Sequence, residues 1–170
     1  VSGGSSSGAA ASVAFDLAAA GIGSDTGGSV RIPAAWNDLV GLKTTSGRLT
    51  LEGVVPLALK FDTIGPLTRS VEDAAQLMAA MEGTKAADLR GASLKGRRLA
   101  VLCTVAHDDM RDEPAESFAT ALDKLKEAGA KVDWIEVPEV SDAMPLATRL
   151  YTAEAYGTWR DGSEARPGAQ

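Results

Sequence analysis

The sequence is poor in the residues that disulfides, metal sites and membrane spans require. It has one cysteine and one histidine among 170 residues, so an internal disulfide is excluded and no cluster with metal-ligand spacing is present. No apolar run approaches about 18 residues, so no membrane span is predicted. No leader with charged, apolar and small-residue regions opens the chain, which leaves secretion without support.

Basic residues are in the minority. The formal net charge is −6, whereas sequence-independent binding to nucleic acid requires a basic face, so nucleic acid is not an expected partner. Hydrophobic residues make up 45% and charged residues 24%, which is ordinary for a soluble globular protein, and the length allows one domain with a real core. A single thiol fits a reducing compartment, so a cytoplasmic location is expected.

The two ends of the sequence resemble cut ends. Residues 1–8 open directly on a Gly/Ser loop, and residues 161–170 read as a loop-like tail. We therefore expect the chain to be a central fragment of a longer protein, with residues 1–170 forming part of one domain.

Local patterns predict alternating helices and strands, which indicates an α/β fold. The alanine-rich residues 5–20 favour a buried helix, with Gly21 as its C-cap. Ser70 and Asp73 form a capping-box pattern that opens another helix. Further helices are expected at residues 30–36, 114–128 and 140–159, and strands at residues 22–26, 39–44, 98–104 and 131–137.

Two Gly/Ser clusters are the main candidates for chemistry, Gly3–Gly8 and Gly23–Ser29. Each precedes a helix-like run, so each offers backbone N–H groups at a helix N-terminus. In the second cluster these groups can converge on one oxygen, as an oxyanion hole requires, and the glycines let the backbone approach a substrate closely. Each cluster alone is also compatible with a turn or a linker, but the alanine-rich helix between them favours a site.

These clusters belong to a longer pattern that resembles the amidase signature. The stretches that carry the resemblance are Gly3–Gly8, Gly23–Ala34, Gly41–Thr45, Gly47–Arg48, Asp62–Pro66 and Thr68–Ala75. The resemblance implies an α/β amidase-signature fold, a mixed β-sheet core flanked by helices, of which only part is present. Residues 1–83 are expected to be the signature core. Residues 84–170 are expected to be a peripheral strand–helix–strand–helix portion of the same domain.

The resemblance also implies a Ser–cis-Ser–Lys triad. Ser29 matches the nucleophile, and Ser5 matches the bridging serine, whose peptide bond to Gly4 is cis in the family; Ser6 is a supporting residue. The implied reaction is hydrolysis of a carboxylic amide C–N bond through an acyl-enzyme, in which a neutral lysine takes a proton through Ser5 while Ser29 attacks. The implied oxyanion hole is formed by the N–H groups of Thr26, Gly27, Gly28 and Ser29.

The sequence departs from this pattern in one important respect. The family's lysine lies well upstream of the bridging serine, and none of the lysines here precedes Ser29. They are Lys43, Lys60, Lys85, Lys95, Lys124, Lys126 and Lys131. None matches the catalytic position, and Lys43 is interpreted as structural. The fragment is therefore expected to be inactive by itself. Ser7, where a second Gly pair is usual, is interpreted as a tolerated variant.

Two charged residues flank the expected nucleophile. Asp25 lies four residues before Ser29, and Arg31 lies two residues after it. Similar pairing in relatives leads to the hypothesis that a salt bridge between Asp25 and Arg31 braces the turn. The alternative is two independent surface charges.

Other readings of the same residues stay open at this point. Residues 4–8 fit G-x-S-x-G, which would make the protein an α/β-hydrolase-like esterase with Ser6 as nucleophile and His107 as base, although this elbow needs a strand directly before it. His107 lies in an acidic loop and is expected to be exposed. A phosphate-binding role for the Gly-rich loops is not supported, because the sequence patterns of phosphate-binding loops are absent. A thiol enzyme would need Cys103 as its nucleophile, but Cys103 ends an apolar strand and is interpreted as a core residue. An inactive scaffold is the remaining alternative.

The sequence leaves the substrate open. The resemblance implies a small-molecule amide, and the family's substrates include glutamine for transamidation of charged tRNA. A component of an amidotransferase that acts on glutamine is therefore an alternative. No cofactor, metal, nucleic acid or membrane is expected as a partner. A homo-oligomer is compatible with the sequence.

Overall fold

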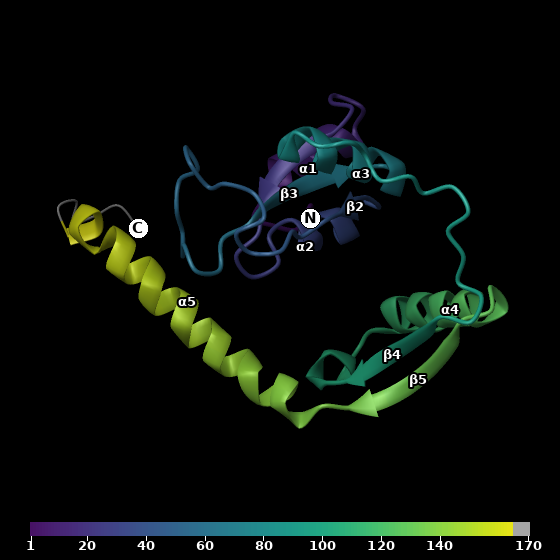
Figure 1. The fold of residues 1–170 in the computed structure, drawn as a ribbon. Helices are drawn as coiled ribbons and strands as arrows, with labels where there is room; N and C mark the ends of the chain where they lie inside the picture. Colours follow the sequence, from purple (N-terminus) through teal and green to yellow (C-terminus); the bar gives the residue numbers. More distant parts are fainter. Residues whose placement is uncertain (165–170) are drawn as a thin grey trace. The chain divides into compact units, whose positions relative to one another are not determined.

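The computed structural model describes residues 1–164, and of residues 161–164 it describes the backbone alone. The chain divides into two compact units (Figure 1). One unit contains Val1–Leu89 together with the chain from Leu150 onward, and the other contains Arg90–Arg149. The expected division at residue 83 into two portions of one domain stays a prediction.

A three-stranded antiparallel sheet forms the centre of the first unit. Its strands are β1 (Gly21–Ser24), β2 (Val40–Gly41) and β3 (Ile64–Thr68), in the order β1-β3-β2. The strand predicted at residues 39–44 is shorter than expected. The N–H group of Leu42 donates to the carbonyl of Pro66 at 3.1 Å, but proline has no N–H group with which to return the bond, so the ladder ends there.

The first helix is also shorter than the alanine-rich segment. Helix α1 is Ser7–Ala14, and Asp16 then adopts a left-handed φ of 58°. Arg69 Nη1 donates to Asp16 Oδ1 at 2.7 Å and to the carbonyl of Val13 at 2.8 Å, which stabilises the chain reversal. The prediction that Gly21 is a C-cap is wrong, because Gly21 begins β1.

Two further helices belong to the first unit. Helix α2 (Arg31–Trp36) follows the second Gly/Ser cluster, and α3 (Val71–Glu82) begins at the predicted capping pattern, with the Ser70 hydroxyl accepting from the Asp73 N–H group at 3.0 Å. The core cluster joins α1, α2 and β3 through Ala10, Val30, Ala34 and Leu67. Its small side chains let the backbones of these elements approach closely.

The second unit is a strand–helix–strand motif. Strand β4 (Arg98–Cys103) pairs in parallel with β5 (Lys131–Glu136), and α4 (Asp112–Glu127) connects them, close to the predicted bounds. The interpretation of Cys103 as core is wrong, because its side chain is exposed. Cys103 is the last residue of β4, in a sheet of only two strands.

The last described helix continues through both units. Helix α5 (Pro138–Glu164) begins earlier and ends later than predicted, and it includes residues 161–164, which the sequence had indicated as loop. The rest of that predicted tail, residues 165–170, lies outside the described residues. None of the helices within residues 1–164 has the length and apolar character that crossing a bilayer requires.

Candidate active site

A buried carboxylate stands at the centre of the second Gly/Ser cluster. Asp25 is fully buried, and it accepts two bonds from Arg31, from Nε to Oδ2 and from Nη2 to Oδ1, each at 3.0 Å. The backbone N–H group of Gly28 donates to Oδ1 at 2.7 Å and that of Val30 to Oδ2 at 3.2 Å. The predicted salt bridge is therefore present, and the alternative of two independent surface charges is wrong.

These contacts set the charge state of the pair. Burial by itself raises the pKa of Asp25, but the hydrogen bonds from Arg31, Gly28 and Val30 outweigh it and hold the pKa below its usual value. The hydrogen bond to Asp25 raises the pKa of Arg31. Asp25 is therefore a stable anion that organises the turn through charge-assisted hydrogen bonds.

The turn requires glycine at position 28. Gly28 has a φ of +127°, and a Cβ added there would lie 2.7 Å from Cδ1 of Ile32, so no other residue fits without displacement. Because the Gly28 N–H group donates to Asp25, it is not available to an oxyanion, and the expectation for this donor is corrected. Within residues 1–164 the N–H groups of Thr26, Gly27 and Ser29 have no acceptor.

The two expected catalytic serines meet through their backbones. The Gly4–Ser5 peptide bond is cis, as the resemblance implies, and the N–H group of Ser6 donates to the carbonyl of Ser29 at 3.0 Å. That nitrogen is bonded directly to the carbonyl carbon of Ser5, so the backbones of Ser5 and Ser29 lie side by side. Gly3 has a φ of 70°, and a Cβ there would lie 2.9 Å from Cα of Pro33, so the cis segment packs tightly on α2.

Ser6 has a role in joining the two clusters. Its hydroxyl donates to the carbonyl of Ser24 and accepts from the N–H group of Ser24, both at 3.2 Å. A Cβ at Gly23 would lie 2.5 Å from this hydroxyl, so the contact leaves no room for a side chain there. The nucleophile-elbow reading expects extended backbone directly before Ser6, whereas Gly3 has a φ of 70° and the Gly4–Ser5 bond is cis.

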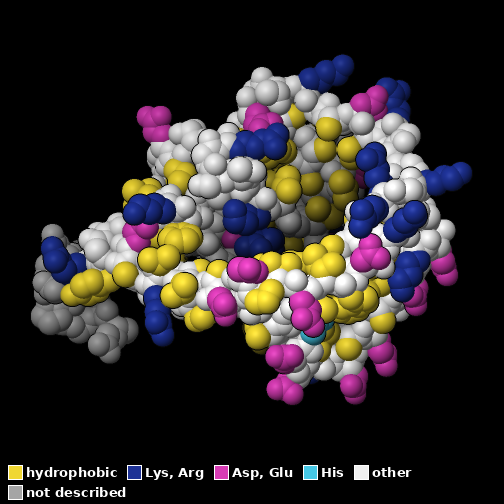
Figure 2. Space-filling view, turned by 60° about the horizontal axis from the view of Figure 1, so that its bottom comes forward, with side chains coloured by type: hydrophobic (Ala, Val, Ile, Leu, Met, Phe, Trp, Pro, Cys, Tyr) yellow, Lys and Arg dark blue, Asp and Glu magenta, His cyan; other side chains and the backbone are white. Residues whose placement is uncertain are grey.

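His107 belongs to the second unit and has structural contacts. Its ring lies 5.4 Å from the ring of Phe118 and 5.5 Å from that of Trp134, between centroids, and its Nε2 lies 3.1 Å from the carbonyl oxygen of Leu102. It is half-buried rather than exposed, which corrects the sequence prediction. Figure 2 shows Asp and Glu side chains (magenta) around the histidine (cyan).

The lysines do not complete the site. The ammonium of Lys43 donates to the carbonyl of Thr44 at 3.0 Å, in keeping with a structural role. Within residues 1–164 no lysine forms a hydrogen bond with Ser5 or Ser29. No group of three or more His, Cys, Asp or Glu side chains in this part of the chain could hold a metal ion.

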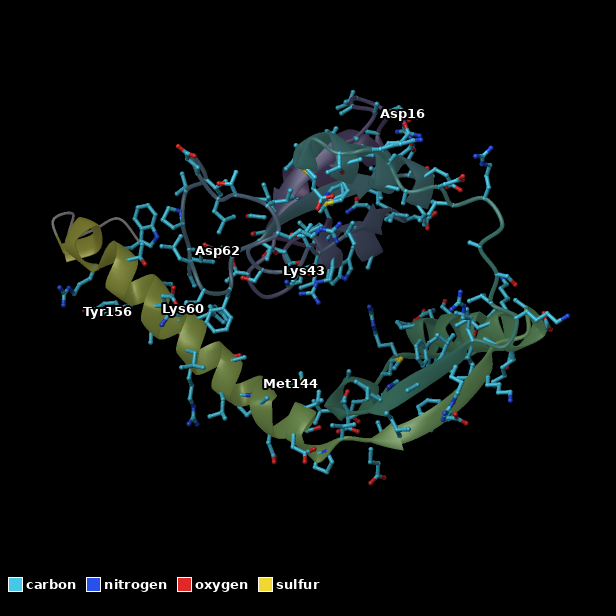
Figure 3. All side chains as sticks on the ribbon, in the orientation of Figure 1. Asp16, Lys43, Lys60, Asp62, Met144 and Tyr156 are labelled. Atoms are coloured by element: carbon cyan, nitrogen blue, oxygen red, sulfur yellow. The ribbon has the colours of Figure 1, made fainter. Side chains whose placement is uncertain are left out.

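Sequence reasoning gave no role to Asp62, although Asp62–Pro66 is one of the stretches that carry the resemblance. Asp62 is 5% exposed and is labelled in Figure 3. Its Oδ1 accepts from the hydroxyl of Thr26, and its Oδ2 accepts from the N–H groups of Leu57 at 2.8 Å and Ala58 at 3.0 Å. A buried aspartate bound to the turn at Thr26–Ser29 is therefore part of the frame of the candidate site.

The structure places a serine with a cis peptide bond beside a second serine on a glycine turn with available amides, which is the arrangement that the resemblance to the amidase signature implies. The comparisons with known proteins agree with this resemblance. The chain belongs to the amidase family, since the family profile described as Amidase matches residues 1–166. The resemblance found in the sequence is thereby confirmed, and the α/β fold is confirmed by the solved structures that match the chain.

Individual relatives cover the chain almost completely. It is 39% identical over 169 residues to a glutamyl-tRNA(Gln) amidotransferase subunit of Chlorobium limicola, with 91% of this chain and 36% of the relative aligned. The crystal structure of the same subunit from Thermotoga maritima matches with a TM-score of 0.86 at 34% identity, over 98% of this chain and 40% of that one. Peptide amidase from Stenotrophomonas maltophilia matches with a TM-score of 0.66 at 28% identity, over 98% and 42%. The chain thus spans about a third of the length of the curated relatives.

Proposed function

We propose that this chain is part of an amidase that hydrolyses a carboxylic amide C–N bond through an acyl-enzyme on Ser29. One observation carries the proposal: the bond from the Ser6 N–H group to the Ser29 carbonyl, which holds the cis Gly4–Ser5 segment against the nucleophile turn. Membership of the amidase family supports it. The lone thiol supports a cytoplasmic location.

The reaction follows from this arrangement. The Ser29 hydroxyl oxygen attacks the amide carbonyl carbon while the Ser5 hydroxyl takes its proton and passes its own to a neutral lysine, which the family supplies from upstream of Ser5. The tetrahedral oxyanion accepts hydrogen bonds from the N–H groups of Thr26, Gly27 and Ser29. Ser5 returns a proton to the leaving amine, and water then hydrolyses the ester. The lysine pKa must fall from about 10.4 towards neutrality, which burial can produce.

The Asp25–Arg31 pair assists the oxyanion indirectly. A buried anion next to the turn would oppose a second negative charge on the substrate. Arg31 offsets the charge of Asp25 through two hydrogen bonds, and the bond from the Gly28 N–H group to Asp25 fixes the turn. Asp25 can therefore brace the turn without cancelling the stabilisation that the remaining amides provide.

A covalent probe tests the assignment of the nucleophile. The full-length protein is incubated with a fluorophosphonate, and the labelled peptide is identified by mass spectrometry. We expect the label on Ser29, because an activated serine hydroxyl beside an oxyanion hole attacks phosphorus as it does an amide carbonyl. Labelling of Ser6 or of a residue in the second unit instead would contradict the proposal.

The 170-residue chain by itself is expected to show no amidase turnover. Its serines and amides are present, but the lysine that accepts the proton is missing, and a serine hydroxyl is a weak nucleophile without a base. The measurement is release of product from a chromogenic amide and ester, with the Ser29→Ala form of the same chain as control. Turnover that Ser29→Ala abolishes would show that this prediction is wrong.

Replacing the only histidine should leave the activity nearly unchanged. The proposed reaction assigns no step to a histidine. We therefore expect His107→Phe in the full-length protein to retain kcat/KM within about threefold, a difference of less than about 1 kcal/mol in transition-state stabilisation. Phenylalanine preserves the ring packing on Phe118 and Trp134. The variant should therefore unfold at the same Tm as the unaltered protein, and measuring Tm is the control. A loss of several hundredfold would restore the esterase reading with a histidine base.

A second candidate is a component of an amidotransferase that acts on glutamine. It is favoured by the 39% identity to the amidotransferase subunit of Chlorobium limicola and by the TM-score of 0.86 with that of Thermotoga maritima. Under this proposal the protein works together with partner subunits rather than only as a homo-oligomer. Rates on glutamine and on simple aliphatic, aromatic and peptide amides distinguish the two candidates: a marked preference for glutamine supports the amidotransferase.

A further inference from the structure

We propose that Asp62 is a positioning residue for the oxyanion site, which fixes the orientation of the Thr26 amide and links it to α5. The inference rests on the proposed function of Ser29 as nucleophile. It concerns residues that do not contact the reacting atoms, and it assigns a role to a buried carboxylate that the triad does not use.

The first step is the way in which Asp62 is held. Its two carboxylate oxygens accept from three donors, the Thr26 hydroxyl and the backbone N–H groups of Leu57 and Ala58. Within the described residues Asp62 has no salt bridge, in contrast to Asp25 with Arg31. A nearly buried carboxylate bound by neutral donors is costly to displace, so Thr26 is held to a rigid acceptor.

The second step concerns the peptide plane between Asp25 and Thr26. Asp25 and Thr63 exchange backbone bonds at 2.8 and 3.1 Å, and the Thr63 hydroxyl donates to the same Asp25 carbonyl at 2.8 Å. In a trans peptide the carbonyl and the following N–H group point in opposite directions. Because the Asp25 carbonyl faces Thr63, the Thr26 N–H group faces away from it. Asp62 holds the side chain of Thr26 and Thr63 holds its peptide, so adjacent residues fix this amide from two sides.

The third step is the connection to α5. The loop that Asp62 holds at Leu57 and Ala58 is held on its other side by α5, where Trp159 Nε1 donates to the Pro56 carbonyl at 2.8 Å and Glu154 Oε1 accepts from the Lys60 N–H group at 3.0 Å. Figure 3 shows Lys60 and Asp62 on the segment beside this part of α5. Asp62 therefore connects Thr26 to the loop at residues 56–60, and α5 holds that loop in position. Through Asp62 the position of the loop fixes the position of Thr26.

The test compares Asp62→Asn, Thr26→Val and Thr26→Ser in the full-length protein. Loss of an oriented oxyanion donor lowers catalysis rather than substrate binding, so we expect Asp62→Asn and Thr26→Val to lower kcat by about tenfold to a hundredfold, with KM changed by less than about twofold. Thr26→Ser keeps the hydroxyl and should retain kcat within about threefold. The double variant Asp62→Asn with Thr26→Val should be no slower than the slower single variant, because both substitutions break the same contact, the hydrogen bond from the Thr26 hydroxyl to Asp62.

Controls separate this proposal from the proposed function. Asp38→Asn makes the same substitution at an exposed position with a φ of 54°, which asparagine tolerates, and should leave kcat unchanged. If fluorophosphonate does not label Ser29 of the unaltered protein, the proposed function fails, and with it the premise of this inference. If Ser29 is labelled but Asp62→Asn and Thr26→Val keep full kcat, or raise KM alone, the role of Asp62 is overturned. Should Asp62→Asn not fold, the comparison of kcat between Thr26→Val and Thr26→Ser decides: equal values in the two variants would overturn the role of Asp62.

Discussion

Ser29→Ala in the full-length protein is expected to lower kcat by about 10⁴- to 10⁶-fold, as removal of a serine nucleophile does in other acyl-transfer enzymes. Stability should be nearly unchanged, because within residues 1–164 only the Ser29 carbonyl, and not its hydroxyl, forms a hydrogen bond. Residual hydrolysis should reflect the oxyanion amides and substrate binding, which remain. The measurements are kcat and KM on a chromogenic amide, with the thermal unfolding midpoint Tm recorded in parallel.

The matched control for this variant is Ser46→Ala, a serine-to-alanine change at an exposed loop position of the same unit. It should leave kcat and Tm as they are. If Ser29→Ala retained more than about a hundredth of kcat, a loss of only about 2.7 kcal/mol in transition-state stabilisation, Ser29 would be a supporting residue rather than the nucleophile.

Asp25→Asn is expected to have the second largest effect, on both stability and rate. Each carboxylate oxygen of Asp25 accepts a backbone N–H group, from Gly28 or Val30, in addition to Arg31. Asparagine must present its NH₂ group to one of these donors, so we expect a loss of about 2–4 kcal/mol in the free energy of unfolding. Arg31 is half-exposed, so its unpaired charge contributes little to this loss. The displaced turn should also lower kcat.

The pH dependence gives an independent readout of the same carboxylate. The pKa of Asp25 is lowered in the folded protein, so its stabilisation is fully present above the unfolded pKa of about 3.9 and is lost as the pH falls through the lower folded pKa. Urea unfolding of the full-length protein between neutral pH and acid should show this component, and Asp25→Asn should lack it. Unchanged stability and rate in Asp25→Asn would refute the brace, and Asp38→Asn is the control.

The sequence predicted the local features of the site better than its long-range contacts. The resemblance implied the cis Gly4–Ser5 bond and the pairing of Asp25 with Arg31, and both involve residues that are close along the chain. The early end of α1 depends on Arg69, which is far from Asp16 in sequence, and the early end of β2 depends on the position of Pro66 in the neighbouring strand. No periodicity or spacing within one element encodes such contacts.

Two details of the site were beyond sequence reasoning for related reasons. A run of four amides predicts donors but not their directions, and only the fold shows that Gly28 points to Asp25. Asp62 bonds to Leu57 and Ala58 nearby and to Thr26 on another segment, so its role appears only when those segments are brought together.

The backbone angle at Gly28 has a consequence for the handedness of the turn. A φ of +127° has the opposite sign to the φ of extended backbone in L-residues, and it is a D-residue that would adopt it readily. The turn at Thr26–Ser29 thus contains one position of inverted chirality, which glycine alone among the genetically encoded residues enters without strain. Substitutions in this turn can change the neighbouring residues, but the achiral residue before Ser29 has no encoded replacement.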